Sequence, residues 1–150
     1  NSEATDEELQ KAIDLAAFRK DLEMLPERLE TLVGEKGVAL SGGQKQRISI
    51  ARALIKNPDI LILDDSLSAV DAKTEKRIID NIREIRKDKT TIITTHRMSA
   101  VEHADQILVL DDGKIIEAGT HEQLLSNDGW YKEQFLRQQV ENNLEEEVTA

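Results

Sequence analysis

The segment from Leu40 to Gln44, with the sequence LSGGQ, combines a hydroxyl, two glycines and an amide at the start of a predicted helix. The first turn of a helix leaves backbone N–H groups without partners, and the helix dipole places about half a positive charge there. Two glycines allow a large anion to approach, and Lys45 and Arg47 follow closely. The segment therefore indicates a helix end that accepts phosphate. A glycine loop with Ser41 as an ordinary N-cap explains the same residues, so both interpretations stand at this point.

Two adjacent carboxylates, Asp64 and Asp65, follow the apolar run Ile60 to Leu63, which is typical of a strand buried on both faces. Open parallel sheets bind ligands at the carboxyl ends of their strands. Successive strand residues face opposite sides, so the two aspartates have different roles. One could hold Mg²⁺, directly or through water, while the other positions or deprotonates a nucleophilic water. Alternatively, the pair only caps the segment Asp65 to Ser68.

His96 follows a second predicted strand, Thr90 to Thr95. A single histidine is more often structural or solvated than functional. Adjacent parallel strands would nevertheless bring His96 and Asp65 to the same edge of the sheet. That position suits a group that senses phosphate or handles protons.

Other polar features have simpler explanations. Asp111 to Gly113 indicates a hairpin turn, His103 and His121 have no partners at metal-ligand spacing, and Glu145 to Glu147 is typical of a solvated terminus. The phosphate cradle G-x-x-x-x-G-K-[ST] occurs nowhere in the sequence. We therefore expect this chain by itself to be unable to hold a nucleotide in that way.

The elements that must position these residues change character along the chain. Thr5 with Glu8 and Ser41 with Gln44 are capping boxes of two predicted helices, and Asn57-Pro58 ends the second of them. The remainder alternates strands and helices, which predicts right-handed crossovers and a mainly parallel sheet. We expect three parallel strands with one antiparallel hairpin, at residues 60–63, 90–95, 106–110 and 114–118. Helices are expected after the caps Asp71 and Thr120 and from about Trp130.

Composition excludes several classes of function. The chain has 150 residues, about one ordinary domain, and a formal charge of −10, which disfavours binding to nucleic acid or to an anionic membrane surface. It has no cysteine, hence no disulfide and no thiolate metal site. The first residue is Asn1 and the first methionine is Met24, so we expect a piece of something longer. No apolar run approaches the ~20 residues that span a bilayer.

Taken together, these motifs resemble the C-terminal part of an ABC transporter nucleotide-binding domain of the multidrug-exporter type. Leu40 to Gln44 resembles the ABC signature, Ile60 to Asp65 the Walker B strand, Ser68 to Asp71 the D-loop and His96 the switch histidine. Glu30 to Gly37 resembles the loop that, in exporters, abuts the coupling helices of the membrane domain. The resemblance covers nearly the whole chain, in matching order and spacing.

The resemblance implies an α/β fold of the P-loop NTPase (RecA-like) type, of which this chain holds the second half only. Residues 1–57 would be the ABC helical subdomain with the signature motif. Residues 58–150 would be the C-terminal half of the RecA-like core. The Walker A loop, the adenine-stacking aromatic residue and the Q-loop glutamine would all lie upstream of Asn1.

The resemblance also implies ATP and Mg²⁺ as cofactors. Two such domains sandwich two ATP molecules head to tail, and each site joins Walker A and B of one subunit to the signature of the other. The resemblance implies that Asp64 binds Mg²⁺ through water and that Asp65 and His96 are catalytic. Ser68 and Asp71 would be D-loop positions. The residues implied to contact the partner's ATP are Leu40, Ser41, Gly42, Gly43 and Gln44. The implied partners are a second nucleotide-binding domain and a transmembrane domain, with no nucleic acid. The chain itself would be soluble and lie at the cytoplasmic face of the membrane.

One position departs from the family pattern. The residue after the Walker B aspartate is usually Glu, but here it is Asp65, whose side chain is one methylene shorter. Loss of good general-base geometry costs roughly 10²–10⁴-fold in rate. We therefore expect this subunit's own site to bind ATP and hydrolyse it poorly, as in the degenerate half of a bacterial heterodimeric exporter.

Two rival functions are weighed against this interpretation. ABC-type DNA-repair ATPases share a signature and a Walker B strand, but no sustained heptads occur here and the acidic charge disfavours DNA. A half-domain without a phosphate cradle could instead act only as a non-catalytic interaction module. A Walker A motif encoded directly upstream, after a membrane domain, would favour the transporter.

Overall fold

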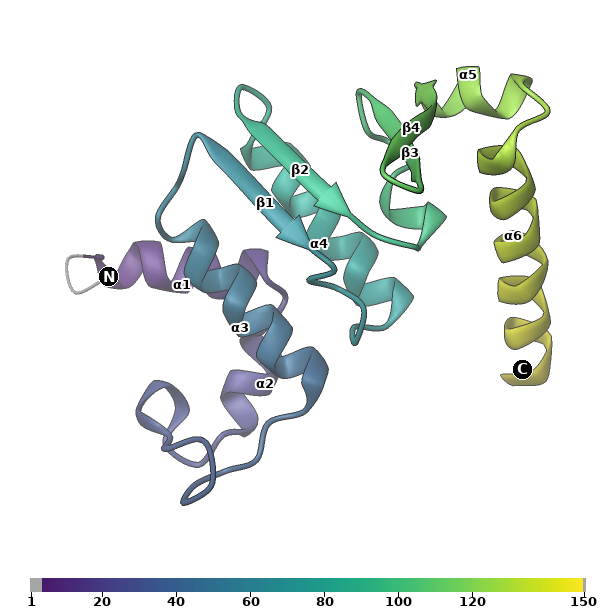
Figure 1. Cartoon of the computed structure of the whole chain (residues 1–150). Helices are drawn as coiled ribbons and strands as arrows, with labels where there is room; N and C mark the ends of the chain where they lie inside the picture. The colour runs from purple at the N-terminus through teal and green to yellow at the C-terminus, as the bar shows by residue number, and fades with distance from the viewer. Residues whose placement is uncertain (1–3, 150) are drawn as a thin grey trace. The chain divides into compact units, whose positions relative to one another are not determined.

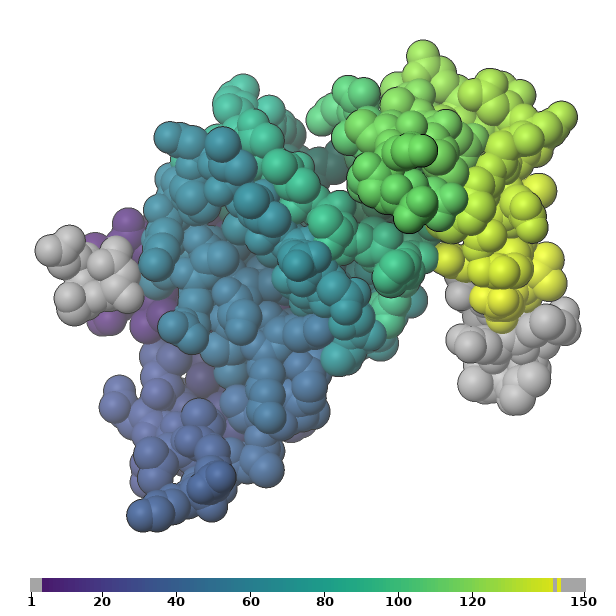
Figure 2. Space-filling view, viewed as in Figure 1, coloured from purple at the N-terminus to yellow at the C-terminus, as the bar shows by residue number. Residues whose placement is uncertain are grey.

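The computed structural model describes residues 4–149 in two compact units, divided between Thr95 and His96. Figures 1 and 2 show the chain coloured by residue number. The observed division differs in position from the expected boundary after residue 57, which rests on the resemblance and stays a prediction. No helix among the described residues is long and apolar enough to cross a membrane.

The first unit contains most of the helices and a pair of strands. Its elements are α1 (Asp6–Leu15), α2 (Arg19–Met24), the 3-10 turn η1 (Arg28–Glu30), α3 (Gly42–Leu54), β1 (Ile60–Asp64), α4 (Ala72–Ile85) and β2 (Thr90–Thr94). Both predicted capping boxes are present, because Thr5 and Glu8 bond reciprocally before α1, as do Ser41 and Gln44 before α3. Asp71 caps α4, as predicted, by accepting from the backbone of Thr74.

Aliphatic side chains and one aromatic ring hold these helices together. Ile13, Phe18 and Leu22 form a buried cluster on α1, α2 and the residue between them, and Ile48 of α3 packs against it. Ile78 of α4 is completely buried. Burial of a side chain of this size contributes roughly 1.5–3 kcal/mol. On α3 itself the buried apolar side chains are Ile50 and Leu54.

β1 and β2 pair in parallel and in register, with Ile62 opposite Ile92. The prediction that β1 is buried on both faces is wrong. Leu61 and Leu63 are buried, whereas Ile60 and Ile62 are about 60% exposed. The blue-green segment that holds the strand pair is visible at the surface in Figure 2. An unbroken apolar run indicates the two faces that a strand could bury, but only neighbouring layers decide whether both are covered.

The second unit joins a hairpin to two helices. Its elements are the 3-10 turn η2 (Met98–Ala100), β3 (Ile107–Asp111), β4 (Lys114–Gly119), α5 (His121–Ser126) and α6 (Trp130–Thr149). Asp112 and Gly113 form the predicted two-residue turn, both with positive φ, which matches the twist of a hairpin. Its core is a cluster of buried side chains from η2, β3, α5 and α6: Met98, Ile107, Val109, Leu124, Tyr131 and Phe135. The side chains of Glu145 to Glu147 lie outside the described part.

The expected three-stranded parallel sheet is a further correction. Among the described residues β1 pairs with β2, and β3 pairs with β4 in a separate antiparallel sheet. The alternation of strands and helices correctly predicted the parallel β1–β2 crossover. It could not predict the neighbour of β3, because strand order depends on pairing between distant segments.

Candidate functional site

The N-terminus of α3 is built by the LSGGQ segment. Ser41 is the N-cap, its Oγ accepts from the backbone N–H of Gln44 at 3.2 Å, and the Gln44 Oε1 accepts from the Ser41 N–H at 2.9 Å. The first turn carries no acidic residue. Ser41 and Gly42 are exposed, Leu40 and Gln44 are half-buried, and Gly43 is buried. An exposed, uncharged cap with no acidic residue in the first turn is what an anion site at a helix end requires.

A polar network inside the first unit supports that helix end. The guanidinium of Arg47 bonds both carboxylate oxygens of Asp21, at 2.6 and 3.0 Å, and the Ala17 carbonyl at 2.9 Å. The Gln44 amide also donates to Asp21, at 2.9 Å. Burial would raise the pKa of Asp21, but the bonds from Arg47 and Gln44 outweigh it and hold that pKa below its usual value. Arg47 is therefore engaged in holding α2 against α3 and is not directed at an anion.

The two aspartates lie at and just beyond the carboxyl end of β1, so the predicted alternation along the strand does not extend to Asp65. Asp64 ends the strand, and its Oδ1 accepts a hydrogen bond from the Thr94 hydroxyl of β2. Asp65 lies one residue further in the left-handed region, at φ 46°. Its N–H donates to the carbonyl and hydroxyl oxygens of Thr94, at 3.1 and 3.2 Å. Asp tolerates this backbone conformation better than most residues, which suits the strand end.

The loop that follows is closed by short-range hydrogen bonds. The Ser68 hydroxyl donates to the Asp65 carbonyl at 3.1 Å. Asp71 accepts from the Thr74 N–H at 2.9 Å, and the bonds from Thr74 hold the pKa of Asp71 below its usual value. The carboxylate of Asp71 is therefore committed to capping α4.

The structure brings the LSGGQ end of α3 against this loop, and α3 and β1 lie side by side in Figure 1. A Cβ on Gly43 would lie 2.6 Å from the carbonyl oxygen of Ala69, and one on Gly42 would lie 3.3 Å from the Ala69 Cβ. Gly43 therefore permits a close backbone approach within the chain, in addition to any approach by an anion. Sequence reasoning missed Gln46, whose side-chain amide bonds the same loop.

His96 belongs to the second unit, where it is exposed and its carbonyl accepts from the Gln138 side chain at 2.7 Å. Its predicted proximity to Asp65 stays a prediction. Asp64 is exposed at the strand end. Mg²⁺ usually keeps several waters and takes one or two carboxylates together with substrate phosphates, so a single exposed carboxylate fits it. The described residues contain no group of three or more His, Cys, Asp or Glu side chains placed to hold a metal without a phosphate.

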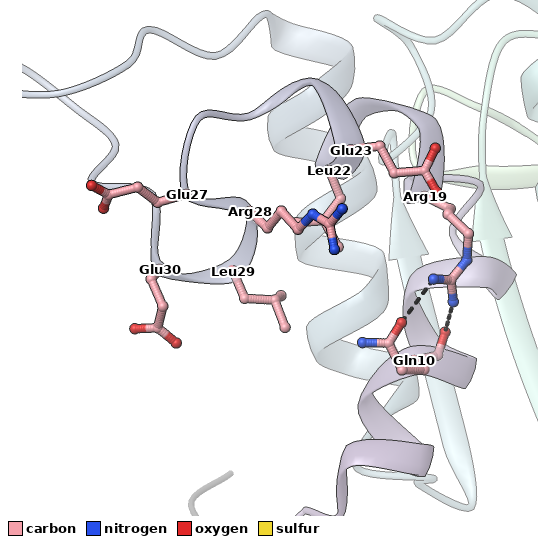
Figure 3. Close-up of a pocket in the computed structure, with 8 residues that line it drawn as sticks. All are labelled: Gln10, Arg19, Leu22, Glu23, Glu27, Arg28, Leu29 and Glu30. Carbon is pink, nitrogen blue, oxygen red and sulfur yellow. Dashed lines mark hydrogen bonds between the residues drawn. The ribbon is translucent and has the colours of Figure 1, made fainter.

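A pocket elsewhere in the first unit has none of these residues in its lining (Figure 3). It is lined by Gln10, Arg19, Leu22, Glu23, Glu27, Arg28, Leu29 and Glu30. Arg19 already donates to the side-chain and main-chain oxygens of Gln10, at 2.8 and 3.3 Å, and to Asp14 at 2.8 Å. Its guanidinium therefore serves to hold α1 and α2 together.

Comparisons with known proteins identify the family to which the chain is similar. Residues 2–68 match the family described as ABC transporter. The chain is 73% identical over 138 residues to a probable multidrug resistance ABC transporter ATP-binding/permease protein, YheI, of Bacillus subtilis, covering 92% of the chain and 24% of that protein. It is 48% identical over 124 residues to an ATP-dependent lipid A-core flippase of Photobacterium profundum, covering 83% and 21%.

A solved structure of a bacterial Atm1-family ABC exporter with ATP bound is similar, with a TM-score of 0.85 and 43% identity, covering 92% of this chain and 24% of that one. The chain thus spans about a quarter of the length of the relatives that it matches. Its motifs, its fold and these similarities all indicate one family. The chain belongs to the ABC transporter family, with the α/β fold of the P-loop NTPases.

Proposed function

We propose that this chain is part of the ATP-binding subunit of an ABC exporter, in which ATP binding and hydrolysis drive transport across a membrane. One observation carries the proposal: the Ser41-capped end of α3, free of acidic residues in its first turn, lies against the loop that follows Asp64 and Asp65. A phosphate-binding helix end and a carboxylate pair are thereby joined in one unit. The names of the relatives, a multidrug resistance transporter and a lipid A-core flippase, support an exporter of a small or lipid-like molecule.

The proposed division of labour follows the chemistry of each group. Backbone N–H groups of α3 and the Ser41 hydroxyl bind the phosphates of an ATP held by the partner subunit, together with Leu40, Gly42, Gly43 and Gln44. Asp64 holds Mg²⁺ through water, and the ion would neutralise charge on the transferred phosphoryl group. Asp65 positions the attacking water, His96 contacts phosphate, and Ser68 and Asp71 shape the D-loop between the two sites.

The site built on Asp65 is proposed to be degenerate. Its carboxylate is one methylene shorter than the Glu usual in the family, and its backbone is fixed by Thr94, so it cannot move forward to compensate. The signature and Asp65 serve different composite sites. This chain therefore completes a competent site for a different partner subunit and is a weak catalyst in its own.

The proposal also assigns the parts of this chain to the domains of a transporter. Residues 1–57 form the helical subdomain and 58–150 belong to the RecA-like core, at the cytoplasmic face of a membrane domain. The relatives that print both ATP-binding and permease functions in one name support that partner. The alternative of a non-catalytic interaction module would place the same surfaces in a protein without ATP turnover.

The test compares two substitutions in the full-length heterodimer. Ser41→Arg places a bulky cation in the anion site and should abolish most ATPase activity, whereas Asp65→Asn should change it by no more than about twofold. Ser49→Ala, on the exposed face of α3, is the matched control and should leave the rate unchanged. A larger loss from Asp65→Asn than from Ser41→Arg would contradict the degenerate site. A wild-type complex without any ATP hydrolysis would favour the interaction module.

A further inference from the structure

The side chain of Gln46, in the second turn of α3, bonds the loop after β1 through both ends of its amide. Nε2 donates to the Ser68 hydroxyl at 2.9 Å and to the Asp65 carbonyl at 3.3 Å. Oε1 accepts from the backbone N–H of Ala69 at 2.9 Å. The amide thus spans the loop from its first residue to its fifth, and its donor and acceptor are both used.

A second contact, independent of that side chain, lies one turn earlier on the helix. Gly43 approaches so closely that a Cβ there would lie 2.6 Å from the Ala69 carbonyl oxygen. Ala69 is therefore held from two directions, its carbonyl facing Gly43 and its N–H bonded to Gln46. Contacts at two successive turns restrict both the distance and the rotation of α3 relative to the loop.

Gln46 also completes the restraint on Asp65. The N–H of Asp65 is bonded to Thr94 of β2, while its carbonyl accepts from Gln46 and from the Ser68 hydroxyl. The left-handed backbone of Asp65 is thereby fixed on both sides, as a non-glycine residue in that region requires.

We propose that Gln46 is a positioning residue, which locks the LSGGQ end of α3 onto the segment Asp65 to Ala69 so that the signature presents to ATP in one fixed orientation. The inference rests on the proposed ATPase function. Gln46 acts through Ala69 and Asp65, because its amide is fully used within the chain. The cap of α3 does not depend on it, since Ser41 and Gln44 bond each other.

That separation predicts a specific kinetic effect. Without the Gln46 amide the phosphate-binding end of α3 still forms, so ground-state binding of ATP persists. The end of α3 would adopt the orientation that the transition state needs less often. Small misplacements of binding groups lower the rate of the chemical step strongly. The turnover number should therefore fall while the KM for ATP stays nearly constant.

The experiment uses the full-length transporter with Gln46→Leu, which keeps the side chain's bulk and removes its hydrogen bonds. We expect kcat for ATP to fall by roughly 10-fold, KM to stay within about twofold, and exchange of the Ala69 amide hydrogen to quicken by about 10-fold. Ser49→Ala is the control on the same helix and should change none of the three. Gln46→Asn, too short to reach both Ser68 and Ala69, should behave like Gln46→Leu.

A double-mutant cycle separates positioning from general loss of stability. Gln46→Leu and Ser68→Ala should be less than additive in kcat, because they remove parts of one shared contact. An unchanged kcat in Gln46→Leu, a rise in KM alone, or full additivity would overturn the proposal. Absence of ATP hydrolysis by the wild-type transporter would instead overturn the proposed function. Hydrogen exchange at the Ala69 amide would then decide alone whether Gln46 holds the loop.

Discussion

The N-termini of α3 and α4 have nearly the same backbone but opposite electrostatics. Ser41 caps α3 with φ −65° and ψ 161°, and Asp71 caps α4 with φ −66° and ψ 154°. Each side chain accepts a hydrogen bond from the N–H three residues on. The α3 cap is neutral and its first turn has no acidic residue, whereas the α4 cap is a carboxylate and its first turn contains Glu75.

This comparison shows that cap geometry and anion binding are separable. A carboxylate at the N-terminus neutralises the helix dipole from within the chain, which stabilises the helix but leaves nothing for an external anion. A serine cap satisfies the same backbone N–H without charge. The end of α3 therefore has an uncharged cap, while the end of α4 is already occupied by the carboxylate of Asp71.

The substitution expected to have the largest effect makes α3 resemble α4. Ser41→Asp keeps a good N-cap, so helix stability should hold, but it places a negative charge where phosphate would bind. We expect ATPase activity of the full-length complex to fall by roughly 10²-fold, as when a donor to a developing anion is lost. Ser41→Asn, an equally good but neutral cap, should retain clearly more activity. Equal activity in the two variants would contradict a phosphate site at this helix end.

A smaller effect is expected at Gly43, which separates the steric role of the glycines from their electrostatic one. Gly43→Ala forces a Cβ to within 2.6 Å of a backbone oxygen, so α3 or the Ala69 loop must shift. Such overpacking costs about 1–3 kcal/mol, measurable as faster opening of α3 by hydrogen exchange. Gly42→Ala meets only the Ala69 Cβ at 3.3 Å and should cost less. A larger destabilisation from Gly42→Ala would argue against the close approach.

The smallest effect is expected at the α4 cap. Asp71→Ala should lower the free energy of opening at the Thr74 amide by about 1 kcal/mol, which is about fivefold in exchange rate. Because the pKa of Asp71 is below its usual 3.8, its contribution is fully present above pH 3.8 and is lost as the pH falls through the lowered value.

The matched variant for that pH dependence is Asp71→Asn, which caps equally well but does not titrate. Protection of the Thr74 amide in Asp71→Asn should lack the acid-induced loss that the wild type shows below pH 3.8. Identical acid profiles in the two proteins would mean that the Asp71 carboxylate does not stabilise this turn.

Local signals in the sequence predicted local structure well. The four predicted caps, at Thr5, Ser41, Asp71 and Thr120, are present, and so is the Asp112-Gly113 turn. These features depend on bonds between residues two to four positions apart, so a short stretch of sequence contains all the participants. Alternation did not extend to Asp65, because the strand ends at Asp64 and Asp65 lies in the left-handed region.

Features that depend on distant partners were missed or misjudged. The outer face of β1 is exposed because nothing in the described chain covers Ile60 and Ile62, which the apolar run could not indicate. Arg47 follows the glycines in sequence, which indicates a neighbour of the anion, but it is bonded to Asp21, 26 residues away. In the sequence, Gln46 cannot be distinguished from an ordinary solvated helix residue. Its role becomes visible only when the loop at Ser68 is folded against it.

Spacing and residue type alone indicate the family, the positions of the helix ends and the kinds of group near them. Which polar groups remain free to bind a ligand depends on the folded arrangement of the chain. Arg47 and Gln46 are both polar and close in sequence to the motifs, yet each is committed to a partner more than 20 residues away in the chain. A polar side chain binds whichever partner folding brings within about 3 Å, and that choice is made by packing between segments far apart in the chain.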